Sequence, residues 1–226
     1  DVLHIGRQNR PELYALHVRK PAPPVARDRC IGVAERIACD GAVLQALSDA
    51  EVRRVVEAVR ASGADSVAVC LLHSYANAAH ERRLAAALGK LGLHVTVSSD
   101  LLPVFREYER AATCAINAVV GPPMARYVGR LDEQIGAGSL RVMASGGGSL
   151  PAEIVRRDAV HTILSGPAGG VLGALAVAAA GGADRIITFD MGGTSTDVSL
   201  CDGGLSGTTE SEFAHLPVAL DMIDIH

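Results

Sequence analysis

Aromatic residues are scarce in this sequence. They make up 3% of its 226 residues, and none of them is tryptophan. Proteins that bind single-stranded nucleic acids stack the bases on aromatic rings, so such a surface is not expected here. The formal net charge of −4 also lacks the basic excess that attracts nucleic acids. A nucleic-acid partner is therefore not expected.

The sequence also lacks long apolar runs and paired cysteine motifs. No apolar stretch reaches the roughly 20 residues of a membrane-spanning helix, and no basic and then apolar leader marks a signal peptide. The five cysteines are odd in number, and no two of them form a CxxC motif. Cys70 lies in an apolar run, where a reduced core thiol is expected. We expect no membrane association and a cytoplasmic location, where thiols stay reduced.

Several widespread catalytic signatures are missing. The P-loop motif GxxxxGK[ST] is absent, and the lysines Lys20 and Lys90 follow no such loop. The GxGxxG motif of dinucleotide binding and the GxSxG motif of serine hydrolases are absent as well. His80 and Glu81 do not begin an HExxH zinc motif, because Leu84 stands in the place of the second histidine. P-loop, Rossmann, serine-hydrolase and zincin functions are therefore not expected.

The sequence does contain an alternation of predicted strands and helices, which is typical of an α/β fold. Hydrophobic residues make up 49% and charged residues 20%, as in an ordinary globular protein. Ser48 and Glu51 form a capping box, in which the Glu51 side chain reaches back to the N-cap, and Gly63 ends that helix. Gly121-Pro122-Pro123 is expected to kink or divide a longer helix. The predicted strands cover residues 32–37, 66–72, 93–98, 140–144, 185–190 and 196–201, and further helices cover about 77–91, 109–130, a short stretch after 151, and 165–180.

The strongest chemical signal is a glycine-containing turn between the last two predicted strands. The first strand ends at Asp190, two glycines make the turn, and hydroxyl residues lead to Asp197 on the returning strand. Glycine can adopt positive φ and has no Cβ, so backbone N–H groups can approach an anion closely. An ordinary hairpin with solvated carboxylates is the alternative, but the complete string favours phosphate binding. The expected phosphate-binding residues are Gly192, Gly193, Thr194, Ser195, Thr196 and Asp197, with Asp190 beside them at a hydrated Mg²⁺.

A second signal is the start of a helix rich in alanine and glycine. Ser165 or Gly166 can act as the N-cap, and Pro167 suits the first helical position. The N-terminal N–H groups and the helix dipole attract anions, so the Ser165-Gly166 end can face a phosphate. Close packing against a neighbouring element explains that end equally well, and it is the better explanation for the glycines further along.

Three weaker clusters carry functional residue types. His73 and Tyr75 follow a predicted strand, where they can take part in proton transfer or metal binding, or simply in hydrogen bonds at the strand end. Arg106 and Arg110 lie in a charged string that faces either a substrate or, with Glu107 paired to Arg110, an ion-paired surface. Near the end of the sequence, candidate metal ligands that also fit the edge of a strand are Asp221, Asp224 and His226.

In combination, these strings resemble the hydantoinase A / 5-oxoprolinase family, which includes the ATP-using subunits of acetone-type carboxylases. The resemblance rests on Ser165-Gly166-Pro167-Ala168 followed by Phe189-Asp190-Met191-Gly192-Gly193-Thr194-Ser195-Thr196-Asp197-Val198. Further matching strings are Ile5-Gly6-Arg7-Gln8-Asn9-Arg10-Pro11, Leu72-His73-Ser74-Tyr75 with His80-Glu81, Arg106-Glu107-Tyr108-Glu109-Arg110, and Asp224-Ile225-His226. The family in turn resembles the actin, sugar-kinase and heat-shock ATPase superfamily, which implies a ribonuclease H-like α/β fold of mixed sheets with helices.

The resemblance also implies how this fold is divided. Residues 1–181 would complete a first lobe that ends in the connecting helix, and residues 182–226 would begin the second ATPase lobe with its phosphate-binding hairpin. The partner hairpin would lie upstream of Asp1 and the adenosine-binding turn downstream of His226. The chain is therefore expected to be an internal fragment with an incomplete fold and, by itself, with little or no ATPase activity.

The implied function is part of an ATP-dependent ring-opening amidohydrolase that phosphorylates a cyclic amide or imide. ATP and Mg²⁺ are the implied cofactors, with Asp190 as the catalytic and metal-binding residue. The implied partners are a hydantoinase B-type subunit or domain and a small cyclic amide, within an oligomer. The resemblance also adds weight to His73, Tyr75, Arg106 and Arg110 as substrate-side residues. The alternatives are the ATP-using subunit of an acetone- or acetophenone-type carboxylase and a non-catalytic assembly module.

Overall fold

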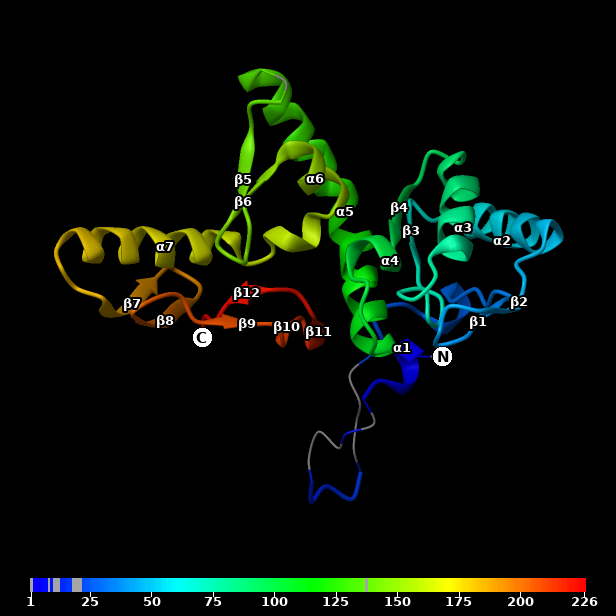
Figure 1. The fold of residues 1–226 in the computed structure, drawn as a ribbon, viewed down its shortest axis with the longest axis horizontal. Coiled ribbons are helices and arrows are strands. Elements are labelled where there is room, and N and C mark those ends of the chain that lie inside the picture. Colours follow the sequence, from blue (N-terminus) through cyan, green and yellow to red (C-terminus); the bar gives the residue numbers. More distant parts are fainter. Residues whose placement is uncertain (1, 8, 10–12, 18–21, 137) are drawn as a thin grey trace. The chain divides into compact units, whose positions relative to one another are not determined.

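Helices and strands alternate along the chain in this computed structural model, which describes residues 2–7, 9, 13–17, 22–136 and 138–226 (Figure 1). The helices are α1 (Val2–Ile5), the 3-10 helix η1 (Arg27–Arg29), α2 (Asp49–Ser62), α3 (Ala79–Gly89), α4 (Ser98–Leu101), α5 (Glu107–Ile135), α6 (Ala152–Arg157), the 3-10 helix η2 (Ala159–Thr162) and α7 (Ser165–Ala180). The strands are β1 (Arg36–Ile37), β2 (Val43–Gln45), β3 (Ser66–Val69), β4 (His94–Val97), β5 (Arg141–Met143), β6 (Ser149–Pro151), β7 (Arg185–Met191), β8 (Thr196–Asp202), β9 (Gly207–Thr208), β10 (Ser211–Phe213), β11 (Leu216–Val218) and β12 (Met222–Ile223). The predicted α/β class is confirmed.

The chain packs into two compact units. Unit 1 comprises Asp1–Pro122 and Glu212–Val218, and unit 2 comprises Pro123–Ser211 and Ala219–His226, so the division falls inside α5. This division concerns packing within the chain. The predicted boundary between residues 181 and 182 concerns the lobes of an ATPase and stays a prediction.

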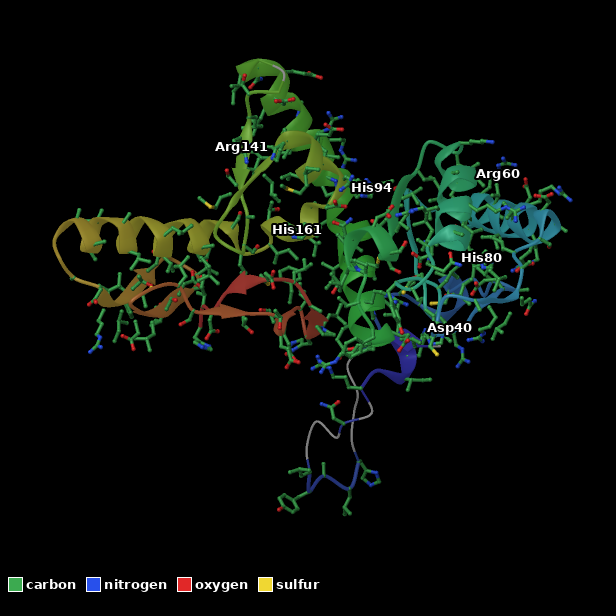
Figure 2. The ribbon with its side chains drawn as sticks, in the orientation of Figure 1. Asp40, Arg60, His80, His94, Arg141 and His161 are labelled. Carbon is green, nitrogen blue, oxygen red and sulfur yellow. The ribbon has the colours of Figure 1, made fainter. Side chains whose placement is uncertain are left out.

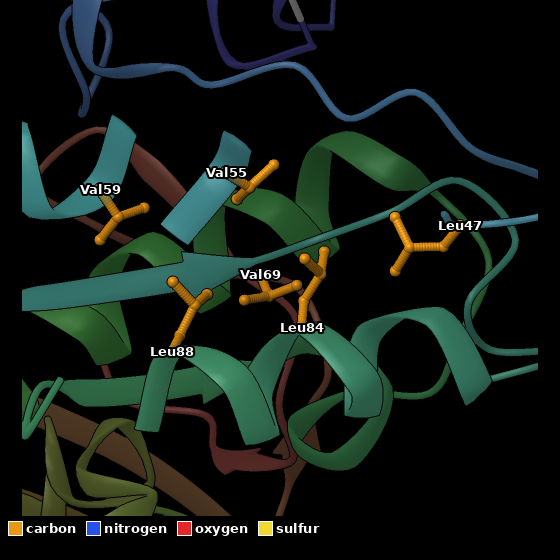
Figure 3. Close-up of a cluster of buried hydrophobic side chains, with 6 residues drawn as sticks. All are labelled: Leu47, Val55, Val59, Val69, Leu84 and Leu88. Carbon is orange, nitrogen blue, oxygen red and sulfur yellow. The ribbon is translucent and has the colours of Figure 1, made fainter. Parts of the chain in front are cut away.

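The core of unit 1 is a parallel βαβ motif. β3 and β4 pair in parallel, with Ser66 opposite His94, and α3 connects them. Valines of α2 and leucines of α3 pack around β3 because each helix has its apolar residues on one side. The buried side chains drawn in Figure 3 are Leu47, Val55, Val59, Val69, Leu84 and Leu88. The β-α-β alternation predicted for this region is confirmed.

The strands predicted at 32–37 and 66–72 are the ones most shortened in the structure, because side chains bind backbone groups that these strands would have used. The Glu81 carboxylate accepts a hydrogen bond from the Leu71 N–H at 2.7 Å, and β3 ends at Val69. The Glu51 carboxylate accepts one from the Ala34 N–H at 2.7 Å, and strand β1 includes only Arg36–Ile37. Carboxylates from a neighbouring helix therefore set where these strands begin or end.

Helix α2 has the predicted caps at both ends. The Ser48 hydroxyl accepts a hydrogen bond from the Glu51 N–H at 3.1 Å, and Gly63 adopts the left-handed conformation with φ 63°. The second half of the predicted capping box is wrong. The Glu51 carboxylate pairs with Arg54 and the Ala34 N–H instead of reaching back to Ser48, and these contacts lower the pKa of Glu51 to about 2.

Helix α5 stays helical through Gly121-Pro122-Pro123, so the prediction that it divides there is wrong. The prolines remove two N–H donors from the helix, but its conformation does not break. Gly121 lies where α5 touches β4, because a Cβ built there would be 2.2 Å from Nε2 of His94, which Figure 2 labels. Among the described residues, no helix combines the length and apolar character needed to cross a membrane.

Unit 2 is built around α7 and the β7–β8 hairpin. Ala168 and Val171 of α7 form a buried cluster with Cys201 of β8 and Ile223 of β12. The end of the chain lies along β8, because the backbones of Val198 and His226 exchange two hydrogen bonds of 2.7 and 2.9 Å. This agrees with the strand-edge alternative for residues 221–226. In the described ranges, no group of three potential ligands could hold a metal ion.

We expect Gly121→Ala to destabilise the chain by about 1–3 kcal/mol, because the half-buried imidazole of His94 must move to admit the methyl group. Gly129→Ala is a matched control in the same helix, since its Cβ would meet only the Arg156 side chain at 3.7 Å. That variant is expected to be neutral or stabilising by up to about 1 kcal/mol through helix propensity. Urea denaturation followed by circular dichroism measures both. Equal stabilities for the two variants would contradict the proposed contact.

Candidate functional site

The register of the β7–β8 hairpin positions the two acidic residues. β7 and β8 are antiparallel, and Asp190 lies opposite Asp197, one pair before the last pair of the ladder. Residues directly opposite each other project from the same face, about 5 Å apart at Cβ. That face also carries the buried Ser199 and Cys201, whereas Ile187 and Phe189 on the other face are exposed. Both carboxylates therefore lie at the tip end of the face that packs against α7.

The turn closes over residues 192–195 without positive φ at either glycine. The Gly192 N–H donates to the Ser195 carbonyl at 3.0 Å, so this N–H serves the turn. A Cβ at Gly193 would meet no atom within 4 Å, and one at Gly192 only the Ser195 carbonyl oxygen at 3.6 Å. Neither glycine is among the residues with positive φ. Turn geometry therefore does not require these glycines, which argues against the ordinary-hairpin alternative.

The tip of the hairpin is open to solvent. Asp190 and every residue from Gly192 to Thr196 are exposed, and Asp197 is half-buried. Within the described residues, neither aspartate forms an ion pair with a basic side chain. Two carboxylates opposite each other repel, and a bound cation relieves that repulsion. The arrangement therefore fits a hydrated divalent cation with nearby donors for phosphate.

The start of α7 differs from the prediction. The N-cap is Leu164, without a side-chain hydrogen bond, so Ser165 is the first helical residue and Pro167 the third. Leu164 has φ −117° and ψ 30°, so it interrupts the helical conformation of Ile163 just before α7 begins. Proline is tolerated at this position, since the first N–H groups of a helix have no partner inside it. The end near Ser165 and Gly166 thus has no side-chain cap that would compete with an anion.

Three of the four expected substrate-side residues lie together in unit 1. The rings of His73 and Tyr75 meet edge to face at 6.0 Å, and the Arg110 guanidinium lies 5.4 Å from the Tyr75 ring centre. Arg110 is fully buried and donates to the carbonyl oxygens of Leu71 (2.7 Å) and Val104 (3.1 Å), so the expected pairing with Glu107 is wrong. The Arg110 guanidinium binds two backbone carbonyl groups instead of a carboxylate. The sequence pattern does not indicate such backbone partners.

Arg106 does not join this cluster. It precedes the first turn of α5 with φ 73°, and its guanidinium lies 5.8 Å from the Phe105 ring centre. Helix α5 begins only at Glu107, so Arg106 and Arg110 do not share a helix face. A substrate role for Arg106 stays a prediction.

Glu81 has a larger role than sequence reasoning gave it. Its side chain is fully buried and accepts hydrogen bonds from the Leu71 N–H (2.7 Å), the Ser98 hydroxyl (2.7 Å) and the Ser99 N–H (2.8 Å). The backbone of Leu71 is thus bound by Glu81 at its N–H and by Arg110 at its carbonyl. Next to it, burial raises the pKa of the Cys70 thiol although Arg110 opposes the shift. Cys70 therefore stays an unreactive core thiol, as expected.

The histidines of this region are engaged elsewhere. Nδ1 of His73 lies 2.9 Å from the Ile37 carbonyl oxygen. Nε2 of His80, labelled in Figure 2, accepts from the Leu47 N–H at 3.3 Å, so its Nδ1 carries the proton toward Glu35 at 2.7 Å. His73, His80 and Glu81 therefore serve three separate partners and do not form a metal site. The sequence contained no signal for these partners, which lie far away along the chain.

Comparison with known proteins identifies the family. The model of the hydantoinase/oxoprolinase N-terminal region matches residues 1–92, and the hydantoinase/oxoprolinase model matches residues 110–226. This chain belongs to the hydantoinase/oxoprolinase family. The family predicted from the hairpin and helix strings is confirmed.

Individual members of the hydantoinase/oxoprolinase family cover nearly all of the chain. The alpha subunit of caprolactamase from Pseudomonas jessenii is 33% identical over 94% of the chain, which spans 30% of that relative's length. The crystal structure of the ATP-dependent caprolactamase from Pseudomonas jessenii superposes with a TM-score of 0.83, at 31% identity, over 99% of this chain and 34% of that one. The nucleotide-free structure of acetone carboxylase gives a TM-score of 0.80, at 29% identity, over 92% of this chain and 31% of that one. The fold is thus shared with family members that differ in their named reactions.

We expect Glu81→Gln to lose much of its stability, because the Glu81 carboxylate is buried and accepts three hydrogen bonds. The amide nitrogen would face a donor and leave buried groups unsatisfied, at a cost of about 2–4 kcal/mol. Glu57→Gln is the matched control, because Glu57 is 65% exposed and pairs with Arg60 on the surface of α2. No measurable change is expected there. Thermal and urea denaturation of both variants test this, and a stable Glu81→Gln protein would contradict the network.

Proposed function

We propose that this chain supplies one phosphate-binding hairpin of an ATP-dependent cyclic amide hydrolase. The main observation behind this proposal is the exposed tip of β7–β8. There, two carboxylates lie opposite each other, beside glycines that the turn geometry does not require. Family membership supports the reaction class. The related caprolactamase is described as ATP-dependent.

The residues at the tip fit magnesium and phosphate in distinct roles. The Asp190 carboxylate would hold hydrated Mg²⁺, with Asp197 opposite it as a second acidic partner. The Gly193 N–H and the hydroxyls of residues 194–196 would donate to phosphate oxygens. The Gly192 N–H closes the turn through the Ser195 carbonyl, and the absence of a side chain at Gly192 would let a phosphate come close to the backbone. When bound, MgATP supplies a phosphoryl group that makes an amide oxygen a better leaving group. An amide carbonyl hardly reacts with water before such activation, so the hairpin serves the difficult step.

The lobe arrangement is part of this proposal. Residues 1–181 would belong to a first lobe and residues 182–226 to the start of a second, and each lobe would contribute one hairpin to the phosphates. The uncapped start of α7 near Ser165 and Gly166 supports a second anion-facing element. Donors on one side only cannot enclose a triphosphate, so we expect the chain alone to have little ATPase activity.

A partner subunit is also proposed. The caprolactamase relative is named as an alpha subunit, which supports a B-type component and an oligomeric enzyme. The free cysteines of the chain, Cys30, Cys39, Cys70, Cys114 and Cys201, support a cytoplasmic location.

The second candidate function is a carboxylase subunit that phosphorylates a ketone enol and bicarbonate, which the similarity to acetone carboxylase favours.

The test is release of inorganic phosphate by the native protein with its B-type partner, Mg²⁺ and ATP. Hydantoin, 5-oxoproline and caprolactam are compared with acetone or acetophenone plus bicarbonate. We expect phosphate release with a cyclic amide, and about a 100-fold loss on Asp190→Asn because the metal ligand is lost. Asp202→Asn, at the open end of the same hairpin where Asp202 pairs with Arg185 at 2.9 Å, should stay active. Phosphate release only with a ketone and bicarbonate favours the carboxylase. An unaffected Asp190→Asn enzyme favours the assembly module.

The open space at Gly193 yields a separate prediction. Gly193→Ala should fold as stably as the parent, because its methyl group meets no protein atom within 4 Å. It should nevertheless raise the KM for MgATP by about tenfold or more, since the methyl group would occupy the space of a phosphate. Gly204→Ala, after β8, also meets no atom within 4 Å and serves as the control. Unchanged kinetics for Gly193→Ala would count against phosphate at this tip.

A further inference from the structure

Unit 1 contains a cavity that the hairpin chemistry does not use. Its volume is about 320 Å³, within the range of small-molecule sites. Its walls come from α1 and the residues that follow it, from Ala22–Pro24, from Tyr108 on α5, and from the turn between β10 and β11. Two strings that carry the family resemblance, one beginning at Ile5 and one at Arg106, therefore meet at this cavity.

The β10–β11 turn holds a histidine where the backbone favours glycine. Ala214 and His215 connect the two paired strands with φ of 51° and 64°. A two-residue turn with positive φ at both positions is of type I′, in which Asn-Gly is preferred. Residues with a Cβ cost about 1–2 kcal/mol each in this conformation. Turn geometry therefore does not favour a histidine at 215, and His215 is the strained residue of this turn that lines the cavity.

The part of the wall formed by the residues after α1 is held against α5 by specific contacts. Gly6 has φ 62°, and a Cβ there would lie 3.8 Å from the Tyr108 ring, so the backbone runs close beside that ring. Nε of Arg7 donates to Glu109 at 2.8 Å, which joins the same segment to α5. Tyr108 can thus present its hydroxyl to the cavity on a fixed backbone.

The lining combines apolar residues with hydrogen-bonding groups. Pro23, Pro24, Leu216 and Pro217 provide apolar surface, and His4, Tyr108 and His215 provide donors and acceptors. Glu212 adds a negative charge, while the charge of Arg7 is balanced by Glu109. A small neutral ring with an amide edge matches this lining better than an anion does.

We propose that this cavity binds the cyclic amide substrate, in neutral form, with His215 and Tyr108 at the amide edge. The proposal rests on the proposed function and assigns a substrate site to it. His215 would be a specificity-determining residue that contacts the substrate, and the proline-rich side would cover the ring. An amide carrying a carboxylate, such as 5-oxoproline, would be disfavoured by Glu212.

The test uses two probes that differ by one carboxylate, 2-pyrrolidone and 5-oxoproline. Each is titrated into the chain at pH 8 while the histidine ring protons are followed by NMR. We expect 2-pyrrolidone to bind at least about tenfold more tightly, because an uncompensated charge near Glu212 is costly. The His215 signal, assigned by its absence in His215→Gly, should shift on binding. Failure of 2-pyrrolidone to shift it, or tighter binding of 5-oxoproline, would overturn the proposal.

Matched variants separate a binding role from a folding role. His215→Gly removes the imidazole while relieving the positive φ, so its Tm should not fall, yet binding of 2-pyrrolidone should weaken by about tenfold. Ala214→Gly relieves the same turn without changing a residue of the cavity wall, and it should bind as the parent does. Parent-like binding by His215→Gly would overturn the assignment.

Failure here is distinguishable from failure of the proposed function. In the native enzyme, His215→Gly should raise the KM for the amide and leave the KM for MgATP unchanged. Amide-dependent phosphate release with an unaltered amide KM in this variant rejects the cavity and retains the proposed function. Specific binding of 2-pyrrolidone without any amide-dependent phosphate release rejects the proposed function and retains the cavity.

Discussion

The antiparallel register of β7 and β8 is the constraint on which the candidate phosphate site depends. Side chains alternate between the faces of a strand, so a shift of one residue exchanges the faces completely. In the observed register, Cys201 and Ser199 are buried against the interior, and the same alternation brings Asp190 and Asp197 to that face at the tip. Burial of the hairpin base therefore decides where the carboxylates project. The apolar packing under α7 and the acidic pair are two consequences of one pairing.

In unit 1, the comparable constraint is the backbone of Leu71. Glu81 takes its N–H and Arg110 takes its carbonyl, so the chain leaves β3 and turns through His73 with φ 57°. Both charged side chains are fully buried, and each is compensated mainly by backbone groups. Such a network is costly when one member is lost, because the remaining groups stay buried without partners. The charged strings around residues 81 and 106–110 therefore include residues that shape the backbone.

The sequence was most informative where structure is determined locally. The Ser48 cap, the Gly63 end of α2 and the extent of the β7–β8 turn follow from residues a few positions apart, and all were predicted. The ends of β1 and β3 were not, because they depend on carboxylates 17 and 10 residues away. Arg110 was misjudged for the same reason, since its carbonyl partner at Leu71 lies 39 residues earlier. The cavity was beyond prediction, because its walls come from four separate parts of the chain.

Two turns depart from local backbone preference in opposite directions. At 192–193 the chain has glycines where φ does not require them, and a side chain would project into open space. At 214–215 it has alanine and histidine where positive φ favours glycine. A glycine is useful where a ligand must come close to the backbone, because it has no side chain. A residue in a strained backbone conformation is retained where a ligand needs its functional group. Positions whose residue type disagrees with their own backbone conformation are therefore candidates for a chemical role. In this chain they include Gly192 and Gly193 at the tip of β7–β8, His215 in the wall of the cavity, and the expected substrate-side residues His73 and Arg106.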